Sequence, residues 1–124
     1  MIIGEEEIPN ERALLTQEDG PMMASSASVK YIVIHCSATR STRDYTAEQL
    51  LRDHKTRGFR TVGYHFYIRK NGDIKSTREI ERIGAHVRGY NARSIGICYE
   101  GGLDCHGRPT DTRTEWQIHS MRVL

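Results

Sequence analysis

The pattern of apolar and polar positions changes near residue 29. Residues 1–28 show no sustained apolar periodicity and end in an alanine- and serine-rich run. Tyr31 to Ile34 then form a continuous β-branched and aromatic run that stops at His35. Such a run is typical of a strand buried on both faces. We therefore expect residues 1–28 to be a disordered or loosely docked extension, and residues 29–124 to form one folded domain.

A helix is expected after the first strand. Thr46 and Gln49 have the spacing of a capping box, and Gly58 stands where a helix C-cap belongs. Positions i, i+3, i+4 and i+7 are occupied by Ala47, Leu50, Leu51 and His54. That spacing predicts one stripe facing the core. Thr114 and Gln117 repeat the capping-box spacing and predict a second helix close to the C-terminus.

Three further strands are expected between the helices. Residues 64–69 and 73–76 flank Asn71-Gly72, a dipeptide typical of a type I′ hairpin turn, so these strands should be antiparallel neighbours. Residues 94–99 form another apolar run, closed by Gly101-Gly102. The order strand, helix, hairpin, strand, helix predicts an α/β fold with a mixed central sheet and helices packed on it.

Charge divides the chain at the same place. Residues 1–28 contain six acids and one base, or −5, so the remainder holds 17 bases and ten acids, or +7, to give +2 overall. A basic domain suits an anionic polymer such as nucleic acid or cell wall, although a modest excess is more often solvated surface. The chain shows no signal-peptide pattern and no apolar run near the ~20 residues of a membrane span. We expect a protein made in the cytoplasm.

The three cysteines, Cys36, Cys98 and Cys105, form no C-x-x-C pair. An odd number without that spacing favours free thiols in a reducing compartment over a disulfide framework or a zinc knuckle. Cys36 and Cys98 lie in strand-like runs, where a free cysteine acts as a small hydrophobe.

A few polar rings are candidates for chemistry. His35 ends a strand, where sites are commonly built, but a single histidine is more often structural. Period-two alternation would send Tyr64 and His65 to opposite faces, so these rings should not share a site. The Tyr64 hydroxyl could donate to an oxyanion or simply cap the core. His86 lies in a basic, aromatic loop that could line a groove. The remaining histidines, His54, His106 and His119, are assigned to structure.

Common hydrolase and nucleotide-binding motifs are missing from the sequence. It contains no H-E-x-x-H, no G-x-S-x-G and no glycine-rich phosphate loop. Residue patterns alone therefore stop short of a reaction.

Four short motifs, taken in their order along the chain, resemble those of a known family. Residues 32–39 (IVIHCSAT), 62–66 (VGYHF), 83–91 (IGAHVRGYN) and 94–97 (SIGI) resemble the N-acetylmuramoyl-L-alanine amidases of the phage lysozyme and peptidoglycan recognition protein family. The resemblance covers roughly residues 29–124. It implies hydrolysis of the amide between the muramoyl lactyl group and L-alanine, with peptidoglycan rather than nucleic acid as the partner. The enzyme would act on the cell wall once released.

The resemblance also implies roles for individual residues. Family members hold a catalytic Zn²⁺ with two histidines and a cysteine or aspartate, and His35 matches the first ligand. Tyr64 matches the catalytic tyrosine, which would bind the water or the oxyanion. His86, Tyr90 and Asn91 match the wall of the substrate groove. A three-ligand zinc with an open position activates water and polarises a carbonyl.

The resemblance further implies that the other two zinc ligands follow the last helix, beyond Leu124. We therefore expect the domain to be incomplete at its C-terminus, with Trp116, Ile118 and Met121 partly uncovered. Two alternatives stay open at this point. One is a non-catalytic peptidoglycan-binding protein, and the other is an inactive truncated amidase.

Overall fold

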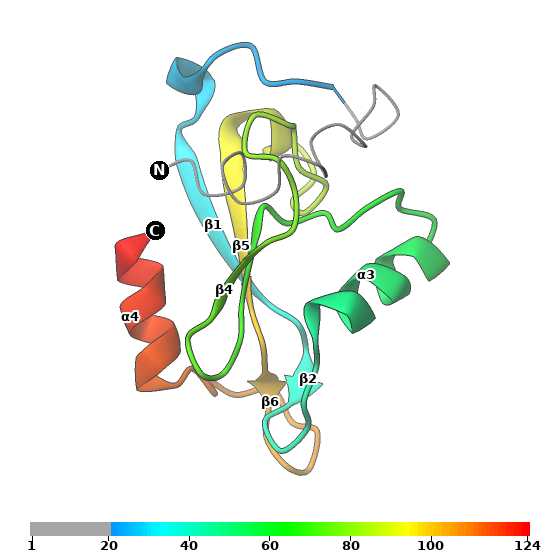
Figure 1. Cartoon of the computed structure of the whole chain (residues 1–124), viewed down its shortest axis with the longest axis vertical. Helices are drawn as coiled ribbons and strands as arrows, with labels where there is room; N and C mark the ends of the chain where they lie inside the picture. The colour runs from blue at the N-terminus through cyan, green and yellow to red at the C-terminus, as the bar shows by residue number, and fades with distance from the viewer. Residues whose placement is uncertain (1–20) are drawn as a thin grey trace.

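The computed structural model describes residues 21–124, so predictions for residues 1–20 lie outside the described part of the chain. Its centre is a four-stranded sheet in the order β1-β5-β3-β4, beside a two-stranded ribbon (Figure 1). The sheet strands are β1 (Tyr31–Cys36), β5 (Ser94–Tyr99), β3 (Phe66–Ile68) and β4 (Ile74–Ser76), and the ribbon pairs β2 (Thr39–Arg40) with β6 (Gly102–Leu103). Within the sheet only β4 is antiparallel to its neighbour. The predicted mixed α/β fold is confirmed.

Two helices lie on opposite sides of this sheet, α3 (Ala47–Thr56) and α4 (Glu115–Val123) (Figure 1). Both predicted capping boxes are present, since Thr46 and Thr114 each accept from the backbone N–H three residues on. Gly58 follows α3 with a φ of +97°, as expected of a glycine that ends a helix. Two short 3₁₀ turns, Ser26–Ser28 and Asn91–Arg93, complete the elements. None of the helices in residues 21–124 is long and apolar enough to cross a membrane.

The hairpin between β3 and β4 differs from the predicted turn. A type I′ turn needs positive φ at both central residues. Here Gly72 has a φ of +92°, whereas Asn71 is not in the left-handed region. The Gly72 N–H donates to Arg69 O, and the Arg69 N–H donates to Asp73 O. The connection is therefore a three-residue loop that ends in a left-handed glycine, and the type I′ prediction was wrong.

Strand β3 is shorter than predicted, and this changes where two rings point. The strand begins at Phe66, so Tyr64 and His65 lie in the irregular segment before it. Period-two alternation does not apply there. Tyr64 packs with the cluster around Tyr67, on the side opposite Phe66. The expectation that Tyr64 and His65 cannot share a site is wrong for this reason.

Strand register gives the sheet two faces of different chemistry. Paired residues of neighbouring strands share a face. The α3 face, which we call the site face, carries His35, Ser94, Gly96, Cys98 and Tyr67. Tyr67 and Cys98 are completely buried there against Leu50 of α3. The α4 face carries Ile32, Ile34, Ile95, Ile97, Phe66 and Ile68, and packs against Met121 and Leu124.

The prediction that strand β1 is buried on both faces was wrong. Ile32 is 60% exposed and Ile34 is 48% exposed, both on the α4 face. Helix α4 packs over β3, at the other side of β5 from β1. The apolar run was correctly assigned as a strand, but the run itself carries no information on which neighbour covers it. Trp116 is also exposed, as expected, while Ile118 and Met121 are half-buried.

A buried carboxylate fixes the ends of three elements. Glu100 directly follows β5 and is 1% exposed. It accepts hydrogen bonds from the Arg69 Nε, the Lys70 N–H and the Tyr45 N–H at 2.7–2.9 Å. Gln117 of α4 donates from its side chain to Ile68 O and Glu100 O. The start of α3, the end of β3 and helix α4 are thereby held against the end of β5.

Part of the predicted extension lies along the domain. Met22 forms a bridge with Arg82, the Met23 N–H donates to Glu81 O, and the Ile83 N–H donates to Pro21 O. Within the described part of the chain, residues 21–23 therefore contact the domain.

Candidate active site

His35 and His86 form the centre of the site. His35 lies on β1, on the site face, and His86 comes from the loop between β4 and β5. The His35 Nε2 and the His86 Nδ1 are 2.9 Å apart, with the rings nearly perpendicular. Two resemblance-based predictions are thus brought together across 51 positions of sequence.

The hydrogen bonds around His86 determine which ring donates in the His35–His86 hydrogen bond. The Ser94 hydroxyl donates its single proton to Tyr90 O at 2.8 Å. Its oxygen can then only accept from His86 Nε2, which lies 3.2 Å away. His86 is therefore protonated on Nε2, and its Nδ1 accepts from His35 Nε2–H. In this arrangement the Nδ1 of His35 keeps a free lone pair.

Tyr64 packs beside both imidazoles. Its ring centroid lies 5.1 Å from that of His35 and 6.3 Å from that of His86. Burial is the largest cause that raises the pKa of Tyr64 to about 12. The hydroxyl thus stays protonated near neutral pH and can donate a hydrogen bond to an oxygen that gains negative charge.

His65 supports the site from behind. It is fully buried. Its Nδ1 accepts from the Gly96 N–H at 3.0 Å, and its Nε2 contacts Arg82 O at 2.7 Å. Its proton is therefore on Nε2. Burial lowers the pKa of His65 to about 4, and burial, together with the charges of His35 and His65, lowers that of His86 to about 4. Burial also lowers the pKa of His35. All three shifts favour the uncharged imidazoles.

Missing side chains make room for the rings. A Cβ on Gly96 would lie 2.7 Å from His86 Cδ2, and one on Gly84 would lie 2.6 Å from the same atom. The site face of β5 accordingly carries only the small residues Ser94, Gly96 and Cys98. Of these three positions, Cys98 alone was noted from the sequence, as a small hydrophobe in a strand. Their alternation with isoleucine and tyrosine was the available signal.

Asn91 and Tyr90 take different positions. The Asn91 Oδ1 accepts from the N–H groups of His86 and Val87, both at 2.9 Å, and so shapes the loop that presents His86. Tyr90 packs edge-to-face on Tyr31, with the Arg93 guanidinium over its ring. Asn91 lines a cavity of the site, whereas Tyr90 lines neither of the two cavities described next.

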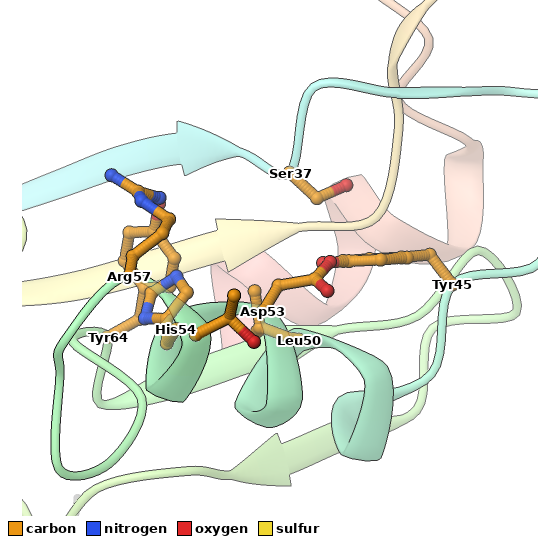
Figure 2. Close-up of a pocket in the computed structure, with 8 residues that line it drawn as sticks. Ser37, Tyr45, Leu50, Asp53, His54, Arg57 and Tyr64 are labelled. Atoms are coloured by element: carbon orange, nitrogen blue, oxygen red, sulfur yellow. The ribbon is translucent and has the colours of Figure 1, made fainter.

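Two open cavities meet at Tyr64. The first, of about 390 Å³, is lined by Ser37, Tyr45, Leu50, Asp53, His54, Thr56, Arg57 and Tyr64. Figure 2 shows His54, Arg57 and Tyr64 at one end of it and the Tyr45–Asp53 pair at the other. The second, of about 330 Å³, is lined by His54, Arg57, Phe59, Tyr64, Ala85, His86, Val87, Arg88 and Asn91. Together they form a groove along α3.

His54 has both a structural and a site position. It is 5% exposed, and its Nδ1 accepts from the Gly63 N–H at 3.1 Å, which fits the structural role assigned to it. It also lines both cavities, a position that was not predicted from the sequence. His106 and His119 line neither cavity.

The described residues do not assemble a zinc site. A catalytic zinc site typically has three protein ligands. His35 offers one lone pair, while the Nδ1 of His86 is occupied by the hydrogen bond from His35. Among residues 21–124, no group of three or more histidine, cysteine, aspartate or glutamate side chains is arranged to hold a metal. All three cysteines are free thiols, as predicted.

Comparison with known proteins identifies the family of this chain. The sequence profile of the N-acetylmuramoyl-L-alanine amidases (Amidase_2) matches residues 25–124. The chain belongs to this family. The endolysin of Klebsiella phage KP32 is 41% identical over 93 residues, which cover 75% of this chain and 62% of that protein. The endolysin of Escherichia phage T7 is 37% identical over 97 residues, which cover 78% and 64%. The chain thus spans a little over three fifths of the length of these relatives.

Solved structures agree with the family assignment. The N-acetylmuramoyl-L-alanine amidase LysC from Clostridium intestinale URNW superposes with a TM-score of 0.67 at 32% identity, covering 86% of this chain and 65% of that one. The peptidoglycan recognition protein PGRP-SA of the bumblebee has a TM-score of 0.68 at 23% identity, covering 85% and 64%. The second likeness concerns the fold alone.

Proposed function

We propose that this chain binds the muramoyl-peptide junction of peptidoglycan in the groove beside α3 and takes part in hydrolysis of the amide between the lactyl group and L-alanine. The observation that carries the proposal is the packing of Tyr64, His35 and His86 where the two cavities meet. Membership of the amidase family and the endolysin relatives support the same reaction. The cell wall would then be its place of action.

Amide hydrolysis makes two demands that these residues can meet. The carbonyl oxygen becomes an oxyanion, and a donor that is stronger for the oxyanion than for the carbonyl lowers the barrier. Protonated Tyr64 is such a donor. The attacking water must be oriented. As long as no metal ion occupies it, the lone pair on His35 Nδ1 can accept a hydrogen bond from that water.

Zinc stays a prediction that rests on the family. Of the predicted ligands, His35 is the one present among residues 21–124. When bound, the ion would polarise the carbonyl and activate water. Dialysis of the full chain against zinc, followed by metal analysis, tests this. Stoichiometric zinc that is lost in His35→Ala would support the prediction, and zinc retained in that variant would contradict it.

The decisive experiment measures binding and release together. The full chain is mixed with purified peptidoglycan and zinc, and bound protein and newly formed alanine amino groups are both quantified. We expect Tyr64→Phe to reduce release by about 10²–10³-fold, the typical loss of one oxyanion donor, while binding changes little. Tyr99→Phe, on the opposite face of the sheet, is the matched control and should keep the parent rate.

A second candidate is a binding protein without catalysis. The incomplete metal ligand set among the described residues favours it. Binding without release of amino groups, in the parent chain as well as in Tyr64→Phe, would support this candidate. Absence of binding by the folded chain would overturn both functions.

A further inference from the structure

The second cavity of the groove is lined by cations without a matching acid. Its lining contains Arg57 and Arg88, and no aspartate or glutamate. Both side chains are exposed, and the Arg57 guanidinium lies over the Phe59 ring, 5.5 Å from the centroid. Among residues 21–124, neither arginine forms an ion pair. A carboxylate that pairs with them in this fold therefore comes from outside the described residues.

The first 20 residues of the chain carry the opposite charge. Their single base is Arg12, and their six acids are Glu5, Glu6, Glu7, Glu11, Glu18 and Asp19, which gives −5. Residues 21–28 contain no charged side chain, so residues 29–124 hold the remaining +7. The acidic segment is thus covalently attached to a domain of complementary charge. Such attachment gives it an effective concentration of about millimolar, so weak charge pairs can form within the molecule.

The point where this segment joins the domain lies next to the second cavity. Met22 forms an antiparallel bridge with Arg82, and the Ile83 N–H donates to Pro21 O. Because the two stretches are antiparallel, the chain followed backward from Met22 runs in the direction that leads from Arg82 to Ala85. Ala85 is where this loop begins to line the second cavity. At Pro21 the chain is therefore directed toward the cavity.

Two acids stand close before Pro21. Asp19 and Glu18 precede it by two and three residues. An extended chain advances at most ~3.6 Å per residue, so their backbones can lie up to roughly 7–11 Å from Pro21. Ala85 is two residues from Ile83, the hydrogen-bond partner of Pro21, which is at most roughly 7 Å of chain. Both carboxylates can thus reach the cationic lining while the described residues stay in place.

We propose that residues 1–20 lie across the second cavity, with Glu18 and Asp19 paired with Arg88 and Arg57. The acidic segment then covers this part of the groove and competes with any ligand that enters it. Exposed charge pairs are individually weak and are screened by salt, so a ligand with more contacts displaces the segment. The segment acts as an internal competitor of peptidoglycan, and this last step rests on the proposed function.

A first measurement tests the contact itself, without any substrate. The backbone amide and guanidinium NMR signals of Arg57 and Arg88 are compared between the parent full chain and the double variant Glu18→Gln/Asp19→Asn. We expect the signals of both arginines to shift, because the substituted residues lie far from them in sequence and act on them only through space. Unchanged signals would overturn the contact.

Glu5→Gln/Glu6→Gln is the matched control. It removes the same charge from the same segment, but at positions far from Pro21 in sequence. The arginine signals should therefore stay as in the parent chain. Equal shifts in the control and in Glu18→Gln/Asp19→Asn would overturn the assigned pairs, because the effect would then come from net charge alone.

A second measurement tests the competition. Binding of the same full-length chains to purified peptidoglycan is measured by co-sedimentation. Two exposed charge pairs together change an equilibrium by about fivefold, so Glu18→Gln/Asp19→Asn should bind about fivefold more tightly than the parent, and the control should bind like the parent.

The two measurements separate this inference from the proposed function. Unchanged arginine signals, together with peptidoglycan binding, would overturn the contact and leave the proposed function intact. Shifted signals with equal binding by the parent and Glu18→Gln/Asp19→Asn would overturn the competition. Shifted signals with no binding by either chain would overturn the proposed function and leave the contact in place.

Discussion

The two faces of the central sheet differ both in polarity and in how fully they are buried. The site face carries histidines, small residues and a tyrosine hydroxyl, yet Tyr67 and Cys98 are completely buried there. The α4 face carries mainly isoleucine and phenylalanine, yet its β1 end is open, with Ile32 60% exposed. Tyr67 can be buried on the polar face because its hydroxyl has a partner within the domain, the carbonyl oxygen of Tyr45. Apolar character shows which residues favour burial, and only the neighbouring elements decide whether it happens.

The largest expected effect compares two isoleucines of the α4 face. Ile68 is fully buried, whereas Ile34 is 48% exposed. Ile68→Ala should lower the free energy of unfolding by about 2–5 kcal/mol, through lost burial and the cavity left behind. Ile34→Ala should cost about 1 kcal/mol or less, because much of its surface already meets water. Urea denaturation measures both. Equal losses would show that β1 is covered in solution.

A smaller effect comes from acid and belongs to the site face. The folded-state pKa of His65 is about 4, below its ordinary 6.5. The neutral form is thus favoured by folding, and this stability is complete above pH 6.5 and lost as the pH falls toward 4. One pKa unit corresponds to ~1.36 kcal/mol. The lowered pKa of His65 should therefore reduce the free energy of unfolding by about 2 kcal/mol between pH 7 and pH 5.

Denaturation at several pH values checks this, with two variants. His65→Gln should reduce the slope of stability against pH, while His106→Gln, in an exposed turn, should leave it unchanged. Part of the slope should survive in His65→Gln, because His86 also has a lowered pKa. An unchanged slope in His65→Gln would mean that His65 is accessible to water in the folded state.

A comparable or somewhat smaller effect is expected from one added methyl group. In Gly96→Ala the new Cβ would press on the His86 ring, so we expect a loss of about 1–2 kcal/mol from overpacking. Ile95→Val, the neighbouring residue on the α4 face, should cost about 1 kcal/mol. Stability alone does not separate the two variants. The imidazole NMR signals of His86 should shift in Gly96→Ala and stay in place in Ile95→Val.

The smallest effect is expected on the open end of the α4 face. Ile32→Thr keeps a β-branched residue in the strand and removes an exposed apolar group. The free energy of unfolding should change by about 0.5 kcal/mol or less. A loss above about 2 kcal/mol would reveal a partner surface on Ile32 and would erase the contrast between the faces.

Local signals in the sequence predicted most helices and strands. They did not predict which elements pack against each other across long sequence separations. Capping boxes at Thr46 and Thr114 act over three residues, and both helices begin where expected. Whether β1 is covered depends on where α4 packs, and no local pattern contains that information. In the hairpin, Asn71-Gly72 predicted a turn correctly, but the Arg69–Asp73 pairing decided its type.

The same contrast between local signals and long-range contacts applies to the candidate site. The motif resemblance selected His35, Tyr64 and His86, which the fold brings together. Residue patterns alone left each of them open, because a contact across 51 positions leaves no periodic trace. The direction of the hydrogen bonds from His35 through His86 to Ser94 depends on side-chain positions, so it was not predictable from the sequence.

The small residues on one side of β5 have a consequence for how this strand tolerates change. Along Ser94–Tyr99, alternate positions lie either on the site face, against His86 or the Tyr67 cluster, or on the apolar α4 face. A saturation library of these six codons should therefore give a survival profile with a period of two. Positions 95, 97 and 99 should accept other large apolar residues, and positions 94, 96 and 98 should reject anything bulkier than the parent. Sequence drift in this strand would then be confined to every second residue.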